Sequence, residues 1–151
     1  MVVAGCEISD ARVSCKRRFD LTQTENAFID LGKLLPHARP DAIALVGASA
    51  GSTKALYIAT KRSDISAVVA DSGVGLDYPS VPVLLIASRA DSMIGGTAEL
   101  AQKFETTLRA RGTIVESHYY DNGGHIVLVN PETTDDAVQR TIAFLKKYAT
   151  R

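Results

Sequence analysis

The sequence predicts an α/β fold in which a mostly parallel sheet is covered by helices on both faces. Segments 42–47, 66–70 and 82–88 are almost continuously apolar, which is typical of strands that are buried on both sides. Segments with apolar residues at helical spacing alternate with these strands, and this alternation predicts three layers, α/β/α. The chain has 151 residues, a length that fits one domain over residues 1–151.

The N-terminal part is predicted to begin with short strands near residues 2–6 and 11–16. A helix follows over 24–35, because its apolar residues form one stripe at helical spacing, and Pro36 ends it. The stripe comprises Ala27, Phe28, Leu31, Leu34 and Leu35.

The central part predicts a strand over 42–47 and then a helix over Ser52–Lys61, from the spacing of its alanine and leucine residues. A second helix begins at Gly96 and Thr97. Thr97 is a candidate N-cap for this helix, and Gly112 is the residue at which it stops.

The C-terminal part predicts a strand over 113–120 and a last helix that begins at Asp135 or Asp136 and ends at Lys147. We expect one apolar stripe to be buried on each of the two C-terminal helices. These stripes consist of Leu100, Ala101, Phe104 and Leu108, and of Val138, Ile142 and Leu145.

The stretch Gly47-Ala48-Ser49-Ala50-Gly51 lies between a predicted buried strand and a predicted helix, which is the context of a nucleophilic serine. At such a turn the backbone of Ser49 is strained and its hydroxyl projects above the sheet, while the flanking glycines let strand and helix approach closely. The backbone N–H of Ala50 can donate to a developing oxyanion. A phosphate-binding loop is excluded, because no Gly-x-Gly-x-x-Gly is present and Lys54 follows too late.

An elbow serine needs a base and an acid, which follow it in the order acid, then histidine. His125 ends the glycine-rich loop 121–125 after the last strand, so it is the candidate base. His118 lies inside a strand pattern and His37 lies in a helix-to-strand connection, and neither is placed like His125.

The candidate acid is Asp91, which follows the strand at 82–88 and precedes the last strand and its helix. Asp71, at the end of strand 66–70, and Asp77 are the alternatives. Asp91 is favoured because it lies in the loop just before the last strand, and the histidine lies in the loop that follows that strand.

Together these motifs resemble the α/β-hydrolase family, from about residue 26 to residue 151. They are residues 44–51, the segment 81–86 that leads to Asp91, and Gly123-Gly124-His125. The resemblance implies that Ser49 attacks an ester, thioester or amide carbonyl, that His125 transfers the proton, and that Asp91 holds the imidazole. It implies no metal and no organic cofactor.

The chain departs from the family pattern in two places. Only about forty residues precede the elbow strand, and no motif for a second oxyanion donor is present; Gly5 or Cys6 is the candidate donor, and a plain edge strand is the alternative. Segment 72–81 is too short for a helical cap, so a minimal fold without a cap domain and an open active site are expected. Such a site favours small or well-solvated acyl substrates, with Leu76 and Tyr78 as candidate walls.

Composition is that of an ordinary globular protein, with 46% hydrophobic and 23% charged residues and no net charge. Neither a nucleic-acid partner nor a membrane-surface partner is expected, and no apolar run reaches transmembrane length. Cys6 and Cys15 are too few for a disulfide scaffold or a metal site, which predicts free thiols in a reducing cytoplasm.

Two functional hypotheses follow from these features. The first is a serine hydrolase that acts on small acyl substrates, within which carboxylesterase, thioesterase and peptidase are not separated. The second is a non-catalytic binding or assembly domain that retains the hydrolase fold. In either case a short sheet leaves an exposed edge strand, which predicts a homodimer.

Overall fold

The computed structural model describes residues 7–9, 12–14, 21–93 and 96–149. The chain forms two compact units, residues 1–38 and 39–151.

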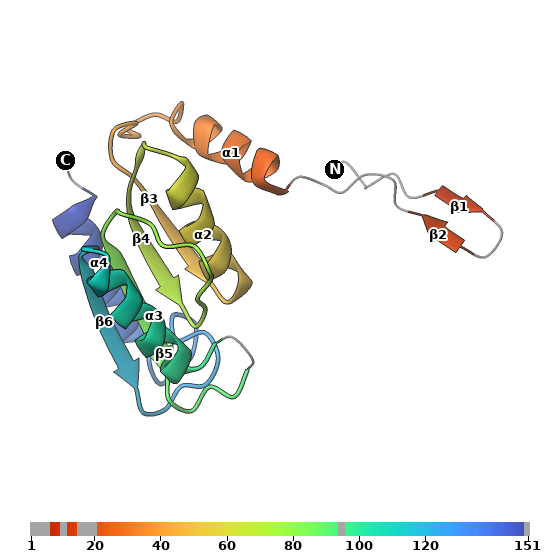
Figure 1. Ribbon diagram of the computed structural model, residues 1–151. Coiled ribbons are helices and arrows are strands. Elements are labelled where there is room, and N and C mark those ends of the chain that lie inside the picture. Colours follow the sequence, from red (N-terminus) through yellow and green to blue (C-terminus); the bar gives the residue numbers. More distant parts are fainter. Residues whose placement is uncertain (1–6, 10–11, 15–20, 94–95, 150–151) are drawn as a thin grey trace. The chain divides into compact units, whose positions relative to one another are not determined.

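The first unit contains β1 (Glu7–Ser9), β2 (Arg12–Ser14) and α1 (Leu21–Gly32), which Figure 1 labels. The two strands pair antiparallel, so the predicted strand at 11–16 is found in shortened form, and the predicted strand at 2–6 lies outside the described residues.

The helix α1 ends at Gly32, earlier than the predicted end at Leu35. Glycine is a poor helix former, and the backbone tightens beyond it, because Leu35 N–H donates to the Gly32 carbonyl in an i→i+3 bond of 3.2 Å. The prediction of this helix end was therefore wrong.

The second unit contains a four-stranded parallel sheet in the order β3-β4-β5-β6. Three helices accompany the sheet, and none lies between β4 and β5. The strands are β3 (Ile43–Ala48), β4 (Ile65–Asp71), β5 (Val83–Ser88) and β6 (Val115–Tyr120), and the helices are α2 (Ala50–Lys61), α3 (Ala98–Ala110) and α4 (Thr134–Tyr148). All of these elements were predicted, and the parallel sheet is confirmed.

Helices cover both faces of the sheet, as predicted: α2 and α3 lie on one face and α4 on the other (Figure 1). Side chains along each strand alternate between the faces. Ala67 and Val69 pack with Phe144 of α4, whereas Ala87 packs with Ala101 of α3. The core therefore has two layers, one on each side of β4 and β5.

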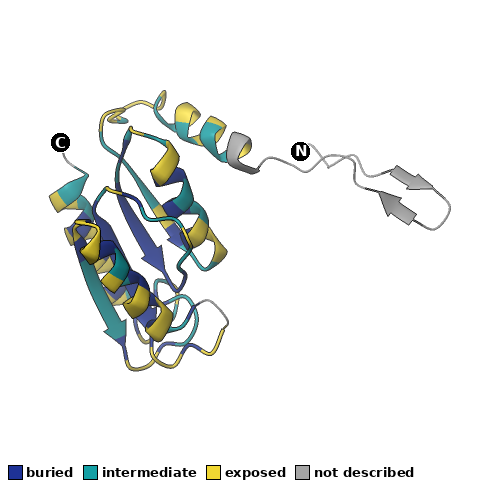
Figure 2. Cartoon of the chain, in the orientation of Figure 1, coloured by how far each residue is buried: buried dark blue, intermediate teal, exposed yellow. Residues whose placement is uncertain are grey.

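The interior and edge strands differ in burial. Every residue of β5 is buried, and all but one of β4 are, whereas Val46 of β3 is 52% exposed (Figure 2). Within the part of the chain that the structure describes, β3 pairs with β4 alone, so its other edge is open.

The predicted buried stripes of the two C-terminal helices are partly wrong. Leu100, Val138 and Ile142 are more than a third exposed, although they were expected to be buried. In α4 the buried stripe is displaced by one position, or about 100° around the helix, and small or polar residues take part in it. That stripe consists of Ala137, Thr141 and Phe144.

No helix is found between β4 and β5, where all residues are described, so the expected absence of a cap is confirmed. No helix among the described residues is long and apolar enough to span a membrane.

Candidate active site

Ser49 occupies the tight turn between β3 and α2, in the backbone conformation expected of a nucleophile elbow. Its φ is 53° and its ψ is −122°, a left-handed conformation that is strained for a residue with a side chain. It precedes the first residue of α2, and its side chain makes no capping hydrogen bond. The hydroxyl is therefore available for other partners, while the first N–H groups of α2 have no acceptor within the helix.

Glycines allow this turn to pack closely, but only one of the two that flank Ser49 is needed for that reason. A Cβ on Gly47 would lie 2.3 Å from the Gly51 carbonyl oxygen, whereas a Cβ on Gly51 would meet nothing within 4 Å. Gly73, which the sequence reasoning missed, is as restricted as Gly47, since its Cβ would lie 2.3 Å from the Ser49 carbonyl oxygen. Its position two residues after the end of β4 carried no recognisable motif.

The structure brings Ser49, His125 and Asp91 together in one hydrogen-bonded series. Ser49 Oγ lies 2.8 Å from His125 Nε2, and His125 Nδ1 lies 2.7 Å from Asp91 Oδ2. The carboxylate can only accept, so Nδ1 carries the proton and Nε2 is left to accept from the serine hydroxyl. This arrangement can remove a proton from Ser49.

The Asp91 side chain is fully buried and fixed by contacts of its own. Its Oδ1 accepts a hydrogen bond of 2.8 Å from the backbone N–H of Met93. Gly96 closes the other side, because a Cβ there would lie 2.4 Å from Asp91 Oδ2 and 2.9 Å from the ring of His125. The sequence reasoning used Gly96 only as a helix start.

A buried serine ties the loop that carries Asp91 to the loop that carries His125. Ser88 Oγ donates to the carbonyl of Asn122 (2.7 Å) and accepts from the N–H of Ala90 (3.0 Å). These two bonds join the loops independently of the contact between the imidazole and the carboxylate.

The other two histidines are not part of this hydrogen-bonded series. His118 lies on β6 with its ring edge-on to Tyr120, and its Nε2 is 3.8 Å from Asp136 Oδ2. Burial, and then the nearby positive charge of Arg140, lower the pKa of His118. His37 belongs to the first unit and has a φ of 68°.

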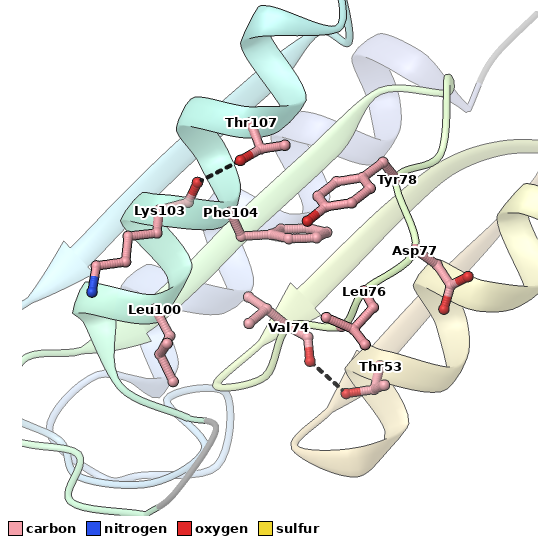
Figure 3. A pocket seen from close by; sticks show the side chains of 10 residues that line it. Thr53, Val74, Leu76, Asp77, Tyr78, Leu100, Lys103, Phe104 and Thr107 are labelled. Atoms are coloured by element: carbon pink, nitrogen blue, oxygen red, sulfur yellow. Dashed lines mark hydrogen bonds between the residues drawn. The ribbon is translucent and has the colours of Figure 1, made fainter.

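A cavity of about 550 Å³ begins one helical turn beyond Ser49, at Thr53, and Ser49, His125 and Asp91 do not line it. Figure 3 shows Tyr78 stacked on Phe104, with a ring-centroid distance of 5.1 Å. The expected wall residues Leu76 and Tyr78 both contribute to the cavity. Its lining consists of Thr53, Val74, Gly75, Leu76, Asp77, Tyr78, Leu100, Lys103, Phe104 and Thr107.

Three further expectations concern the second oxyanion donor, the cysteine thiols and a metal site. Gly5, Cys6 and Cys15 lie outside the described residues, so neither candidate second donor nor the state of the thiols is placed. Among the residues that the structure does describe, no cluster of His, Cys, Asp or Glu could hold a metal ion.

Comparison with known proteins gives matches in structure alone. No protein-family model matches the sequence, and no curated protein matches it. An esterase from Pyrococcus furiosus matches 85% of this chain with a TM-score of 0.71 and 17% identity, and the chain spans 62% of that protein.

Two more solved structures show the same likeness. The acylaminoacyl peptidase of Pyrococcus horikoshii matches 85% of the chain with a TM-score of 0.69 and 16% identity, and the chain spans 28% of it. An α/β-hydrolase enzyme from a deep-sea metagenome library of the Medee basin matches 89% with a TM-score of 0.63 and 18% identity, and the chain spans 69% of it. The chain therefore has the α/β-hydrolase fold, and it spans less than two thirds of the esterase and the peptidase.

Proposed function

We propose that this protein is a serine hydrolase that cleaves small carboxylic esters or thioesters through an acyl-enzyme intermediate. The observation that carries the proposal is the unbroken series from Ser49 Oγ through the His125 imidazole to the buried Asp91 carboxylate, with contacts of 2.8 and 2.7 Å. The fold shared with an esterase and an acylaminoacyl peptidase supports the same class of reaction.

In the first step Ser49 Oγ attacks the substrate carbonyl carbon while its proton passes to His125 Nε2. The carbonyl π pair moves onto oxygen, and the N–H of Ala50 at the start of α2 donates to that oxyanion. Asp91 stabilises the imidazolium that has formed. When the tetrahedral species collapses, the C–O or C–S bond to the leaving group breaks and His125 returns the proton to it.

In the second step water takes the place of the serine. His125 Nε2 accepts a proton from the water as its oxygen attacks the acyl carbon, and the proton then passes to Ser49 Oγ as the ester bond to serine breaks. The products are the free acid and the original enzyme. This scheme requires no metal or organic cofactor.

The substrate proposed for this site is a small acyl ester whose apolar part lies in the cavity between α2 and α3. The cavity starts near the elbow helix, and Leu76 at its rim is 89% exposed. Hydrolysis of p-nitrophenyl esters should be fastest for short acyl chains, because no cap encloses a long one. A rate that peaks at long acyl chains would contradict this assignment.

We also propose that the open edge of β3 mediates a homodimer. Val46 on this strand is 52% exposed, and an unpaired strand edge is a template for another strand. Light scattering at micromolar concentration should give the dimer mass, and Val46→Lys should give the monomer mass. A monomer for the unaltered protein would remove the proposal.

The test of the hydrolase is covalent labelling with a fluorophosphonate, followed by measurement of intact mass. The unaltered protein should gain one adduct, and Ser49→Ala should gain none. Ser80→Ala, which changes an exposed serine in the loop before β5, is the matched control and should label fully.

Each outcome decides between the two functional classes. A single adduct that depends on Ser49, with turnover of short esters, supports the hydrolase. A well-folded protein that gains no adduct at high probe concentration would overturn it, and a non-catalytic binding domain with the hydrolase fold would take its place.

A further inference from the structure

Asp71, the last residue of β4, is fully buried beside the turn that carries Ser49. Its carbonyl oxygen accepts hydrogen bonds of 2.8 Å from the backbone N–H of Ser49 and from Ser52 Oγ. The same Ser52 hydroxyl lies 2.8 Å from the Gly47 carbonyl oxygen. The backbone of Asp71 therefore fixes the position of the elbow.

The carboxylate of Asp71 binds the loop on the other side, just after His125. Its Oδ1 accepts from the N–H of Val127 (3.1 Å) and its Oδ2 accepts from the N–H of Leu128 (2.9 Å). Ser72 completes the contact, because its hydroxyl donates to Asp71 Oδ1 (2.8 Å) and accepts from the N–H of Ile126 (3.1 Å). The three residues that follow His125 are thus all held by Asp71 and Ser72.

This loop needs such support, because its backbone is strained. Ile126 has a φ of 63°, a conformation that a β-branched residue rarely adopts. Strain of this kind persists only where the surrounding contacts over-determine it. Because Ile126 directly follows His125, relaxation of its backbone would rotate or withdraw the imidazole from Ser49.

The contacts also indicate the charge of Asp71. Ser72, Val127 and Leu128 all donate hydrogen bonds to its carboxylate, which is the pattern of an ionised group. Burial raises the pKa of Asp71, while the hydrogen bonds from Leu128, Ser72 and Val127 and the nearby His125 act in the opposite direction. A buried negative charge close to His125 favours the imidazolium that forms when Ser49 loses its proton.

We propose that Asp71 is a positioning residue for the His125 base. Its backbone fixes Ser49 and its carboxylate fixes the loop after His125, so one buried residue sets the distance between nucleophile and base. The inference rests on the proposed hydrolase function and assigns to Asp71 a role distinct from that of Asp91, because its carboxylate is hydrogen-bonded to the backbone after His125 and not to the imidazole.

The test is Asp71→Asn, an isosteric change that leaves the carbonyl contacts to Ser49 and Ser52 in place. The amide nitrogen cannot accept, so at least one N–H of the loop loses its partner. We expect kcat for a short p-nitrophenyl ester to fall about tenfold to a hundredfold with KM unchanged, because a small displacement of the base slows the chemical step. The acid limb of the kcat/KM profile should move to lower pH, since the imidazolium loses a nearby negative charge.

The matched control is Asp135→Asn, an exposed aspartate in the first turn of α4, which should keep the unaltered rate and pH profile. An Asp71→Asn protein with unaltered kcat and an unaltered acid limb would overturn the inference. A different result, an unaltered protein that neither reacts with fluorophosphonate nor turns over esters, would instead overturn the hydrolase function itself.

A second variant decides the matter if Asp71→Asn does not fold. Ser72→Ala keeps the buried carboxylate and removes the acceptor for the Ile126 N–H, so kcat should fall about fivefold to tenfold with KM unchanged. Unaltered kcat in folded Ser72→Ala, as judged by circular dichroism and thermal unfolding, would overturn the inference on its own.

Discussion

Asp71 and Asp91 are both buried aspartates near the carboxyl ends of neighbouring strands, yet they contact different parts of the same loop. Asp91 accepts from the imidazole of His125, whereas Asp71 accepts from the backbone N–H groups that follow it. The two carboxylates have the same chemistry, so the difference comes from the donors that each one meets. The positions of β5 and β4 in the sheet place the Asp91 carboxylate next to the ring of His125 and the Asp71 carboxylate next to the backbone that follows His125.

The largest effect is expected from Asp91→Asn. The amide can donate to His125 Nδ1 and so favours the tautomer whose Nε2 carries the proton, which cannot accept from Ser49. We expect kcat/KM for a short ester to fall about a thousandfold to ten-thousandfold. A loss no greater than that of Asp71→Asn would erase the distinction between the two aspartates.

Gly96→Ala tests how tightly the Asp91 side of the site is packed. The added Cβ would lie 2.4 Å from Asp91 Oδ2, so the carboxylate or the imidazole must move, and we expect kcat to fall about a hundredfold. Gly51→Ala is the matched control, because the space around Gly51 is open and its substitution should leave kcat unchanged. Equal rates for the two variants would contradict the packing argument.

The double variant Asp71→Asn, Asp91→Asn tests whether both aspartates act through His125. Residues that act as one unit are strongly non-additive, so the second substitution should cost less than about tenfold once Asp91 has been changed. Multiplication of the two single losses, measured as kcat/KM on the same ester, would show that Asp71 acts independently of the imidazole.

The smallest effect concerns stability against pH. Burial raises the pKa of Asp71 in the folded protein above that of the unfolded chain, so the folded state binds more protons between the two values. The contribution of Asp71 to stability therefore falls as pH rises through this window, which begins near the usual aspartate pKa of about 3.9.

Urea unfolding at pH 4 and pH 7 measures this contribution by difference. The change in the free energy of unfolding from pH 4 to pH 7 should be more negative in the unaltered protein than in Asp71→Asn. An equal or opposite difference would show that the buried carboxylate carries no cost in the folded state.

The sequence was a good guide wherever the signal is local. The apolar strands, the turn at Ser49 and the chain order of Ser49, Asp91 and His125 were all legible, because strand, turn and helix depend on residues close together in the chain. The absence of a cap followed from the length of segment 72–81 in the same way.

The sequence was a poor guide to contacts between distant segments. Val138 and Ile142 are as apolar as a buried stripe requires, but the face that α4 turns to the sheet is set by packing on β4 and β5, and Ala137 and Phe144 occupy it. Helical periodicity alone could not choose between stripes that differ by one residue.

What the sequence by itself determined, then, is the order of the elements and the candidate nucleophile, base and acid. Only the tertiary structure showed which groups Asp71 contacts and revealed that Gly73 and Gly96 pack against Ser49 and Asp91. The physical reason is distance along the chain: most of these contacts join residues more than twenty positions apart, and no local pattern records which backbone N–H or ring nitrogen a buried carboxylate will meet.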